Sequence, residues 1–321
     1  MTPTADSTGG IIGSFSIGPN AAMAWTDRAI GNHLIVGIAD SVLLVGREGA
    51  GPGEFRMIAD LGWSGDTIWT SDPRIQRFQL FSRTGTLLRS EAVPFRAAFA
   101  WTGTDTLIGF PVQSMVDTAL AIVRFTLGGS GLDTLALFRN QSVPPLQLSM
   151  GGGRSIVGPQ PLAERSTGSH SPDGSRWCGV ESRPGTEMRL ACVAPDGRSL
   201  VDTTIQVVPE PLEQAEIDRI IDGFLEIPGM SRGGIESAMH IPEHRPRVAR
   251  IIVADDGRIW LQRSSMRDSI AVWQRWHADG TEAGTLTLLP MQRALSLRGD
   301  SLYLVAADAD GIQHVERCLL K

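Results

Sequence analysis

Lysine is nearly absent from this chain of 321 residues, in which Lys321 is the only lysine among 29 lysine and arginine residues. Without an internal lysine, the chain has no residue for a Schiff base and none for a phosphate-binding loop of the G-x-x-x-x-G-K-[ST] type. A G-x-G-x-x-G turn after a strand is also absent, which excludes the common dinucleotide-binding motif. No D-x-[DN]-x-[DN]-G calcium loop is present either.

Long apolar runs and a basic charge balance are missing as well. No stretch approaches the roughly 18 apolar residues that span a bilayer, so we expect no transmembrane segment and at most a peripheral membrane association through a complex. Residues 1–10, expected to be disordered, have neither the basic nor the apolar region of a signal peptide. The chain is therefore either cytosolic or has lost its signal peptide. The formal net charge of −6 argues against a nucleic-acid partner.

The chain has 3 cysteines and no C-x-x-C pair, which excludes a zinc knuckle. Cys178 and Cys192 lie in two strand-like runs on either side of Arg183–Thr186. A hairpin centred on Gly185 would place the two cysteines opposite each other, close enough for a disulfide. Two buried free thiols are the alternative, and the sequence leaves both open.

A tight turn of glycine, aspartate or asparagine followed by strand-forming residues recurs along the chain. Its copies are Gly31–Ile35, Gly65–Trp69, Thr104–Ile108, Asp173–Trp177, Asp256–Trp260 and Gly299–Tyr303. Their last residues are 34, 39, 69, 83 and 43 positions apart. Three of these spacings match a four-stranded propeller blade of ~40 to 50 residues, and six copies indicate six blades. The pattern therefore predicts an all-β fold, a six-bladed β-propeller with four-stranded blades.

The ends of the chain predict how this ring closes. After Gly311 only one strand remains, Gln313–Leu319, which leaves the sixth blade one strand short. The run Ile11–Ile17 precedes the first copy of the turn. We expect it to form the outer strand of the last blade, because this pairing would remove two exposed sheet edges. Residues 11–321 are thus expected to form a single propeller domain.

Two insertions, at about 140–165 and 209–245, account for the two long spacings. The first is rich in proline and glycine and is expected to be an irregular loop. The second contains an amphipathic helix at about 211–226, which either packs its apolar stripe on the propeller or serves as a partner-binding or lid element. Both insertions connect an outer strand to the next inner strand, so we expect them on one face, beside the mouth of the central channel.

Arginines recur at the expected starts of the inner strands. The five that share this position are Arg56, Arg96, Arg165, Arg247 and Arg293. A ring of guanidinium groups at the channel mouth would suit a carboxylate, phosphate or sulfate ligand. The alternative is that each arginine pairs with a neighbouring carboxylate such as Glu54 or Glu164.

Four further residues are secondary candidates for the site. Glu54 belongs to a glycine-rich segment that is expected to form a tight corner at the mouth. His170 is placed to reach the channel from the fourth blade. His240 and His244 have H-x-x-x-H spacing, but Pro242 between them disfavours the helix that would bring both imidazoles to one metal ion. We therefore predict no metal site and no cofactor from these residues.

The segment Gly46–Arg56, followed by Gly65–Trp69 and Asp72, resembles bacterial six-bladed β-propeller proteins related to the NHL-repeat group. Those proteins carry a similar G-R-E-G-x-G-P-G-E-F segment before a D-x-[IL]-W strand. The stretch Pro246–Trp260 is similar to their penultimate blade. Such proteins are commonly exported and most have no assigned activity, so the resemblance implies a periplasmic or extracellular location and says little about chemistry.

Two functions follow from the sequence. The first, which we favour, is a non-catalytic propeller scaffold that binds a partner protein or a small anionic ligand at the channel-mouth face. The alternative is an enzyme of the lactonase or lyase type, with Ca²⁺ or another divalent ion at the channel mouth, and this alternative depends on fold analogy.

Overall fold

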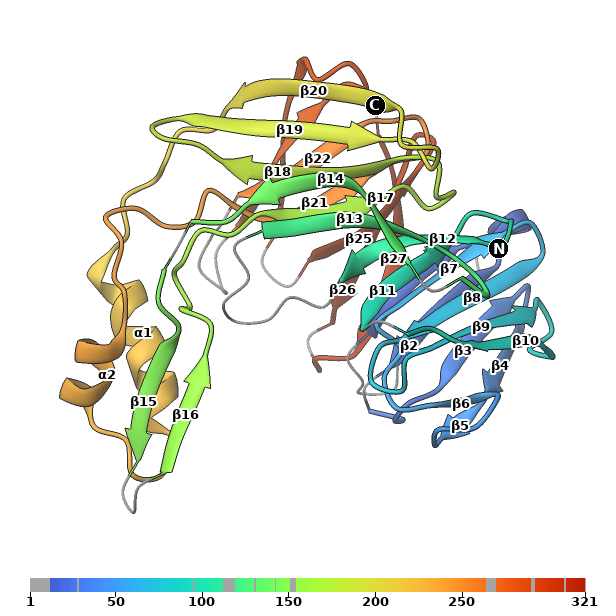
Figure 1. Ribbon diagram of the computed structural model, residues 1–321, viewed down its shortest axis with the longest axis horizontal. Coiled ribbons are helices and arrows are strands. Elements are labelled where there is room, and N and C mark those ends of the chain that lie inside the picture. The colour runs from blue at the N-terminus through green and yellow to red at the C-terminus, as the bar shows by residue number, and fades with distance from the viewer. Residues whose placement is uncertain are drawn as a thin grey trace.

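A computed structural model of the chain contains six β-sheets arranged as blades around a central channel, which confirms the predicted six-bladed propeller (Figure 1). The structure describes residues 12–27, 29–94, 96–111, 119–129, 131–141, 143–150, 154–263, 270–289, 292–308 and 310–320. The expected disorder of residues 1–10 lies outside the described residues. Within them, neither helix is long and apolar enough to cross a bilayer.

The first three blades have four antiparallel strands each, paired in chain order with the first strand innermost. Blade 1 consists of β1 (Ile12–Ile17), β2 (Met23–Asp27), β3 (Leu34–Ile38) and β4 (Ser41–Val45). A short corner follows, with β5 (Arg47–Glu48) and β6 (Glu54–Phe55). Blade 2 consists of β7 (Asp60–Ser64), β8 (Thr67–Asp72), β9 (Arg77–Ser82) and β10 (Leu87–Ala92). Blade 3 consists of β11 (Ala97–Trp101), β12 (Thr106–Pro111), β13 (Ala119–Thr126) and β14 (Leu132–Arg139).

The other three blades complete the ring. Blade 4 consists of β17 (Thr167–His170), β18 (Trp177–Ser182), β19 (Glu187–Val193) and β20 (Ser199–Gln206). Blade 5 consists of β21 (Val248–Val253), β22 (Ile259–Arg263), β23 (Ala271–Trp276) and β24 (Glu282–Leu288). Blade 6 consists of β25 (Arg293–Arg298), β26 (Ser301–Ala307) and β27 (Gln313–Leu319), so it has three strands among the described residues.

Local turn chemistry and blade-to-blade packing explain why these segments form blades. The turns into the second strands place glycines in the left-handed region, for example Gly257 at φ 86° and Gly299 at φ 51°, where other residues are strained. Trp69, Trp177 and Trp260 follow at one position of the second strands, and each is at most 1% exposed. These indoles fill the space between neighbouring blades, which makes the repeated tryptophans packing residues.

The prediction for the N-terminal strand is wrong. β1 pairs with β2 as the innermost strand of blade 1 and does not complete blade 6. The turn Gly31–Ile35 connects β2 to β3, whereas its five counterparts connect the first strand of a blade to the second. In blade 1 that first connection is the short 3-10 turn Pro19–Ala21. Aligning the blades on their glycine turns therefore shifts blade 1 by one strand and leaves β1 without a partner.

The ring closes by packing rather than by a shared strand. β1 lies against β25, and side chains of blades 1 and 6 share one apolar core. Arg298, at the end of β25, donates from Nη1 to the carbonyl oxygens of Ile17 and Gly18, at 2.7 and 2.8 Å. Arg293, at the start of β25, donates to the carbonyl oxygen of Ile12. Apolar contacts and hydrogen bonds from two arginines therefore join blades 1 and 6, where the sequence predicted a shared strand.

The two insertions form one projecting unit, which we call the arm (Figure 1). It consists of the hairpin β15 (Leu146–Met150) and β16 (Arg154–Gly158), and of the helices α1 (Gln214–Leu225) and α2 (Arg232–Ala238). The irregular loop expected at about 140–165 is wrong, because β15 and β16 pair in register. The expected helix is present as α1, and α2 was not predicted.

The arm has a core of its own. Ile217 and Ile221 of α1 and Ile235 of α2 are buried together with Leu146 and Leu148 of β15. The apolar stripe of α1 therefore packs on the other insertion. One interpretation of the sequence placed this stripe on the propeller surface, and that interpretation is wrong. Each insertion covers apolar area that the other would expose, so the two insertions stabilise each other.

Candidate functional site

The central channel contains a cavity of about 1000 Å³, which we call the channel cavity. Its walls come mainly from the innermost strands β1, β7, β17, β21 and β25. The lining contains apolar side chains and several hydroxyl side chains, namely those of Ser14, Ser16, Thr26, Thr167, Ser169 and Ser296. The side chains in the lining that carry or can carry charge are Asp27, Asp60, His170, Arg250 and Arg293.

The five arginines singled out from the sequence all lie near the start of an innermost strand, but they differ in environment. Arg56 and Arg96 are exposed, and Arg165 is half-buried; none of the three lines the channel cavity. Arg247 is only 3% exposed. Of the five, the structure brings Arg293 alone into the lining of the cavity.

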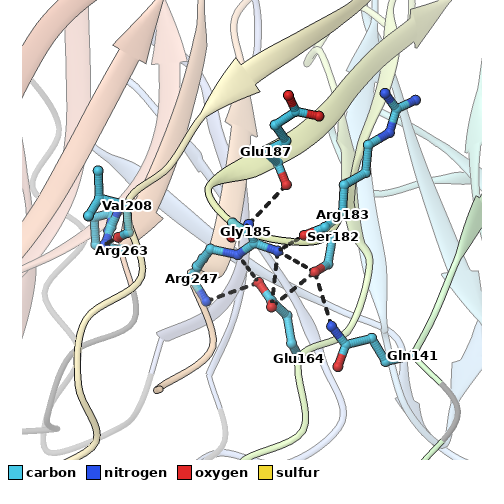
Figure 2. A network of polar contacts seen from close by, with 9 residues as sticks. All are labelled: Gln141, Glu164, Ser182, Arg183, Gly185, Glu187, Val208, Arg247 and Arg263. Carbon is cyan, nitrogen blue, oxygen red and sulfur yellow. Dashed lines mark hydrogen bonds and ion pairs between the residues drawn. The ribbon is translucent and has the colours of Figure 1, made fainter. Parts of the chain in front are cut away.

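Arg247 is held in a buried network at the base of the arm (Figure 2). Its Nε and Nη2 donate to the two carboxylate oxygens of Glu164 at 2.8 and 3.2 Å. The remaining donors go to the carbonyl oxygens of Arg183, Gly185 and Glu187 and to the hydroxyl of Ser182. Glu164 ends the first insertion and Arg247 ends the second, so this network ties both ends of the arm to the β18–β19 turn. Arg247 is therefore a structural residue, and its guanidinium has no donor left for a ligand.

Arg250, in the middle of β21, has the opposite environment. Among the described residues, its one hydrogen bond runs from Nη1 to the carbonyl oxygen of Ala294, at 2.5 Å, and it contacts no carboxylate. Ala294 follows Arg293 in β25, so the two guanidinium groups lie on adjoining walls of the cavity. Burial first, and the positive charge of Arg293 second, lower the pKa of Arg250 to about 10. At neutral pH it still carries its charge, and no carboxylate of the described residues pairs with it.

His170 and Asp60 form an ion pair across the channel, between blades 4 and 2. The Nε2 of His170 lies 3.0 Å from Oδ2 of Asp60, and its Nδ1 lies 2.8 Å from the carbonyl oxygen of Ser171. Both neighbours accept hydrogen bonds, an arrangement that favours the doubly protonated, positively charged imidazole. Burial opposes this charge, but the Asp60 carboxylate raises the pKa of His170 above its ordinary value. The indole of Trp177 stacks on the ring at 4.5 Å between centroids.

The other sequence candidates lie outside the channel cavity. Glu54 holds the glycine-rich corner together, because its carboxylate accepts from the backbone N–H of Gly51 and from Nε of Arg47, both at 2.8 Å. The Gly51 N–H first and Arg47 next hold the pKa of Glu54 below its usual value. His240 and His244 line a second cavity of about 200 Å³ at the base of the arm. Among the residues described, no three or more His, Cys, Asp or Glu side chains form a group that could hold a metal ion.

One motif was overlooked in the sequence: Gly229–Gly233 matches the G-x-S-x-G pattern of serine hydrolases. In hydrolases this pattern forms a sharp turn between a strand and a helix. Here Ser231 follows a turn between two helices, and its hydroxyl accepts from the backbone N–H of Gly234 at 3.3 Å as the N-cap of α2. The match is a helix cap.

Cys178 and Cys192 are joined by a disulfide. They face each other across β18 and β19, with 4.0 Å between their Cα atoms, and both side chains are fully buried. Of the two alternatives that the sequence left open, the structure therefore contains the disulfide. Cys318 is a free thiol.

Asp60 and Arg250 were not predicted from the sequence, in which the arginines near the strand starts were the residues singled out. The signal for Arg250 is present: it is the one charged residue inside the otherwise apolar strand Val248–Val253. An innermost strand is covered by its neighbours, so a charged side chain in its middle must face the channel. Asp60 is harder to recognise as a channel residue from the sequence, because it is the first residue of β7. An aspartate at that position can equally belong to the preceding loop.

No protein-family model matches this chain, and no curated protein matches it in sequence. The resemblance to the NHL-repeat group therefore stays a prediction. Solved structures share the fold. A member of the DUF4221 family from Bacteroides vulgatus has a TM-score of 0.54 at 8% identity, over 96% of this chain and 92% of that one.

Two further solved structures overlay less closely. Regucalcin, a calcium-binding protein from Agrobacterium tumefaciens, has a TM-score of 0.46 at 13% identity, over 95% of this chain and 89% of that one. A gluconolactonase from Xanthomonas campestris has a TM-score of 0.47 at 11% identity, over 98% and 89%. At these identities only the fold is shared. The protein is a six-bladed β-propeller with a projecting arm and a channel cavity whose lining includes both carboxylate and guanidinium groups.

Proposed function

We propose that this protein binds a small anionic ligand in the channel cavity, with Arg250 and Arg293 as its anchors. The observation that carries the proposal is the environment of Arg250. Its charge is half-buried in a cavity of about 1000 Å³, beside a second guanidinium and without a carboxylate partner among the described residues. A buried charge is normally paired, so a negative group from a ligand is the missing partner.

The position of these charges favours a small ligand over a partner protein as the occupant of the channel. Arg250 lies inside the cavity, whereas Arg56 and Arg96, which a partner protein could reach, do not line it. Guanidinium groups bind carboxylates and phosphates through paired hydrogen bonds, and such bonds are stronger away from bulk water. The proposed site is therefore the channel and not the ring of arginines at its mouth.

The experiment is calorimetric titration of the purified protein with sodium acetate, malonate, sulfate and phosphate at constant ionic strength. We expect at least one anion to bind, and Arg250→Gln to weaken that binding about tenfold or more, because a hydrogen bond to a charged group contributes about 1.5 to 3 kcal/mol. Arg198→Gln is the matched control, since Arg198 is an exposed arginine far from the channel lining. Equal binding by the Arg250 variant and the wild type would contradict the proposal.

We also propose that the protein functions outside the reducing cytosol, in the periplasm or the extracellular space. The buried disulfide between Cys178 and Cys192 supports this location, because disulfides persist in oxidising compartments. The resemblance to exported propellers implies the same location.

A further inference from the structure

Asp27, at the end of β2, is a carboxylate in the lining of the channel cavity that the proposed function does not use. The residue is only 4% exposed. Its Oδ1 accepts from the backbone N–H of Ala29 at 2.8 Å, in its own turn. Within the described ranges, its Oδ2 has no hydrogen bond and the carboxylate forms no ion pair. A buried carboxylate is normally balanced by a cation, so Oδ2 is a position for a positive group of a ligand.

Asp60, the second carboxylate in the described lining of the cavity, differs from Asp27 because both of its oxygens have partners. Its Oδ2 lies 3.0 Å from Nε2 of His170. Its Oδ1 accepts from the backbone N–H of Leu61 at 2.9 Å. Asp60 therefore belongs to the wall of the channel, whereas Asp27 has an oxygen that faces the cavity without a partner.

A further acceptor lies in the turn that follows β2. Asn32 lines the cavity and is half-buried, and its side-chain amide has no hydrogen bond to any residue that the structure describes. The amide oxygen of asparagine and the oxygens of a carboxylate both accept hydrogen bonds, and an ammonium group has three N–H donors. Two such side chains supply fewer ligands than the 6 to 8 oxygens that Ca²⁺ takes. This position therefore suits an ammonium group better than a metal ion.

Asp27 and Arg250 lie on different walls of the same cavity. Arg250 of β21 donates to the carbonyl oxygen of Ala294 in β25, and β25 lies against β1. Arg293, which precedes Ala294, donates to the carbonyl oxygen of Ile12 in β1. Ile12 in turn faces Asp27 across the ladder of β1 and β2. The inner strands β25 and β1 thus separate the two opposite charges, and a small ligand with a charge at each end can contact both.

We propose that the channel cavity takes a zwitterionic ligand, with an anionic group on Arg250 and an ammonium group on Asp27 and Asn32. The anionic half rests on the proposed function, and the ammonium half is a second position that a simple carboxylate, phosphate or sulfate leaves empty. The chemical class is that of amino acids in which a short chain separates the amine from the carboxylate. A ligand with negative charge at both ends is disfavoured, because its second charge would face Asp27.

The test compares ligands in pairs that differ by one amine. β-Alanine, γ-aminobutyrate and ε-aminocaproate are titrated into the full chain by calorimetry, beside propionate, butyrate and caproate. The ionic strength is held constant, because screening alone changes the affinity of charged ligands. We expect at least one amino acid to bind at least about tenfold more tightly than its matched carboxylate, because a charge-assisted hydrogen bond contributes at least that factor. This comparison on the wild type needs no variant.

Asp27→Asn assigns the advantage of the amine to one residue. The variant loses the charge but keeps an oxygen that accepts from the backbone N–H of Ala29, so we expect it to fold. The amino acids should lose their advantage, while the matched carboxylates should bind at least as tightly as before, since a negative group has been removed. Asn32→Ala should reduce the advantage by a smaller factor. Asp66→Asn is the matched control and should leave the advantage unchanged, because Asp66 is an exposed aspartate outside the lining of the cavity.

The outcomes separate this proposal from the proposed function. Equal binding of each amino acid and its matched carboxylate to the wild type would overturn the zwitterionic ligand and leave the proposed anion site intact. An advantage of the amine that survives in Asp27→Asn would overturn the role of Asp27. Ethylammonium, which carries the amine alone, tests the cationic position by itself. If it binds the wild type but not Asp27→Asn, and no carboxylate binds, the proposed function and the zwitterionic ligand fail and only the cationic position at Asp27 is supported. If none of these ligands binds, both proposals fail.

Discussion

Arg247 and Arg250 lie three positions apart, yet their surroundings give them different roles. The guanidinium of Arg247 is saturated by Glu164, by backbone carbonyl oxygens and by Ser182, which makes it a permanent part of the fold (Figure 2). Arg250 has one carbonyl partner and otherwise faces the channel cavity. A guanidinium is a binding group only where the fold leaves donors unused.

Replacing Arg247 should destabilise the protein. Arg247→Ala leaves the carboxylate of Glu164 and several carbonyl oxygens without partners, so we expect a loss of about 3 kcal/mol in the free energy of unfolding. Arg247→Lys keeps the charge but cannot form the paired contact with Glu164, and it should lose an intermediate amount. Denaturant unfolding measures both changes.

The exposed residue Arg198 supplies the control for this series. Arg198→Ala should change the free energy of unfolding by less than about 0.5 kcal/mol, as surface substitutions usually do. If Arg247→Ala unfolds at the same denaturant concentration as the Arg198 variant, the network in Figure 2 does not stabilise the fold.

Among the elements, the arm differs from the blades because its strands and helices pack on one another. Its core residues belong to a cluster that contains no blade residue, and its ends meet the propeller at the Arg247–Glu164 pair. Arg263 adds a second attachment, since it donates to the carbonyl oxygen of Val208 at the start of the second insertion (Figure 2). A unit that is built this way can lose structure without opening the ring.

Ile235→Ala tests this independence. Ile235 is fully buried in the arm, and truncating a buried isoleucine costs about 2 to 5 kcal/mol. Hydrogen exchange should become faster in α1, α2, β15 and β16 and stay unchanged in the blades. Leu225→Ala is the control, because Leu225 is 38% exposed at the end of α1. An equal rise in exchange across blade 4 would show that the arm and the ring unfold together.

Within the arm, the sequence predicts the helix α1 but not the hairpin of β15 and β16. The 3.6-residue spacing of apolar residues in 211–226 predicts α1, because helical periodicity is local. The β15–β16 hairpin carries no comparable signal: its alternation is short and is flanked by proline and glycine. Its stability depends on contact with α2 and on burial of Leu146 and Leu148, which come from a tertiary contact between the two insertions.

For the whole molecule, the closure of the ring and the disulfide both bear on stability. Blades 1 and 6 share no strand, so the junction between them depends on the common apolar core and on Arg293 and Arg298. Within blade 4, the bond between Cys178 and Cys192 links neighbouring strands β18 and β19 through two residues that are 14 positions apart in sequence. Such a crosslink stabilises a fold chiefly by restricting the unfolded chain.

Counting thiols tests the disulfide and the proposed location together. Protein exported to an oxidising compartment and unfolded without reductant should react at Cys318 alone, and at all three cysteines after reduction. Reduction should lower the free energy of unfolding by about 3 kcal/mol, as expected for a loop of this length. Cys318→Ser is the control and should show no reactive thiol before reduction. Three reactive thiols in the unreduced wild type would contradict the disulfide and remove the support that it gives to the proposed location.

The sequence by itself determined the class of fold and the number of blades. Glycine turns and the tryptophans that follow them are local signals, and their spacing repeats wherever a blade repeats. The same pattern fails at the first blade, because the 3-10 turn Pro19–Ala21 connects its first two strands in place of a glycine turn. An alignment on the glycine turns therefore assigns the strands of blade 1 one position out of register. Strand pairing is a contact between distant segments, and no local signal distinguishes β1 as an inner strand from β1 as an outer strand.

Only the tertiary structure decided which charges form the site. The sequence places five arginines at equivalent strand starts, but equivalence along the chain does not fix what each guanidinium contacts. Glu164 approaches Arg247 from the other insertion, and Ala294 approaches Arg250 from the next blade. These neighbours, distant in sequence, determine whether the N–H donors of a guanidinium are already used. The reason is that electrostatic and hydrogen-bond energies depend on distance in space and not on position in the sequence.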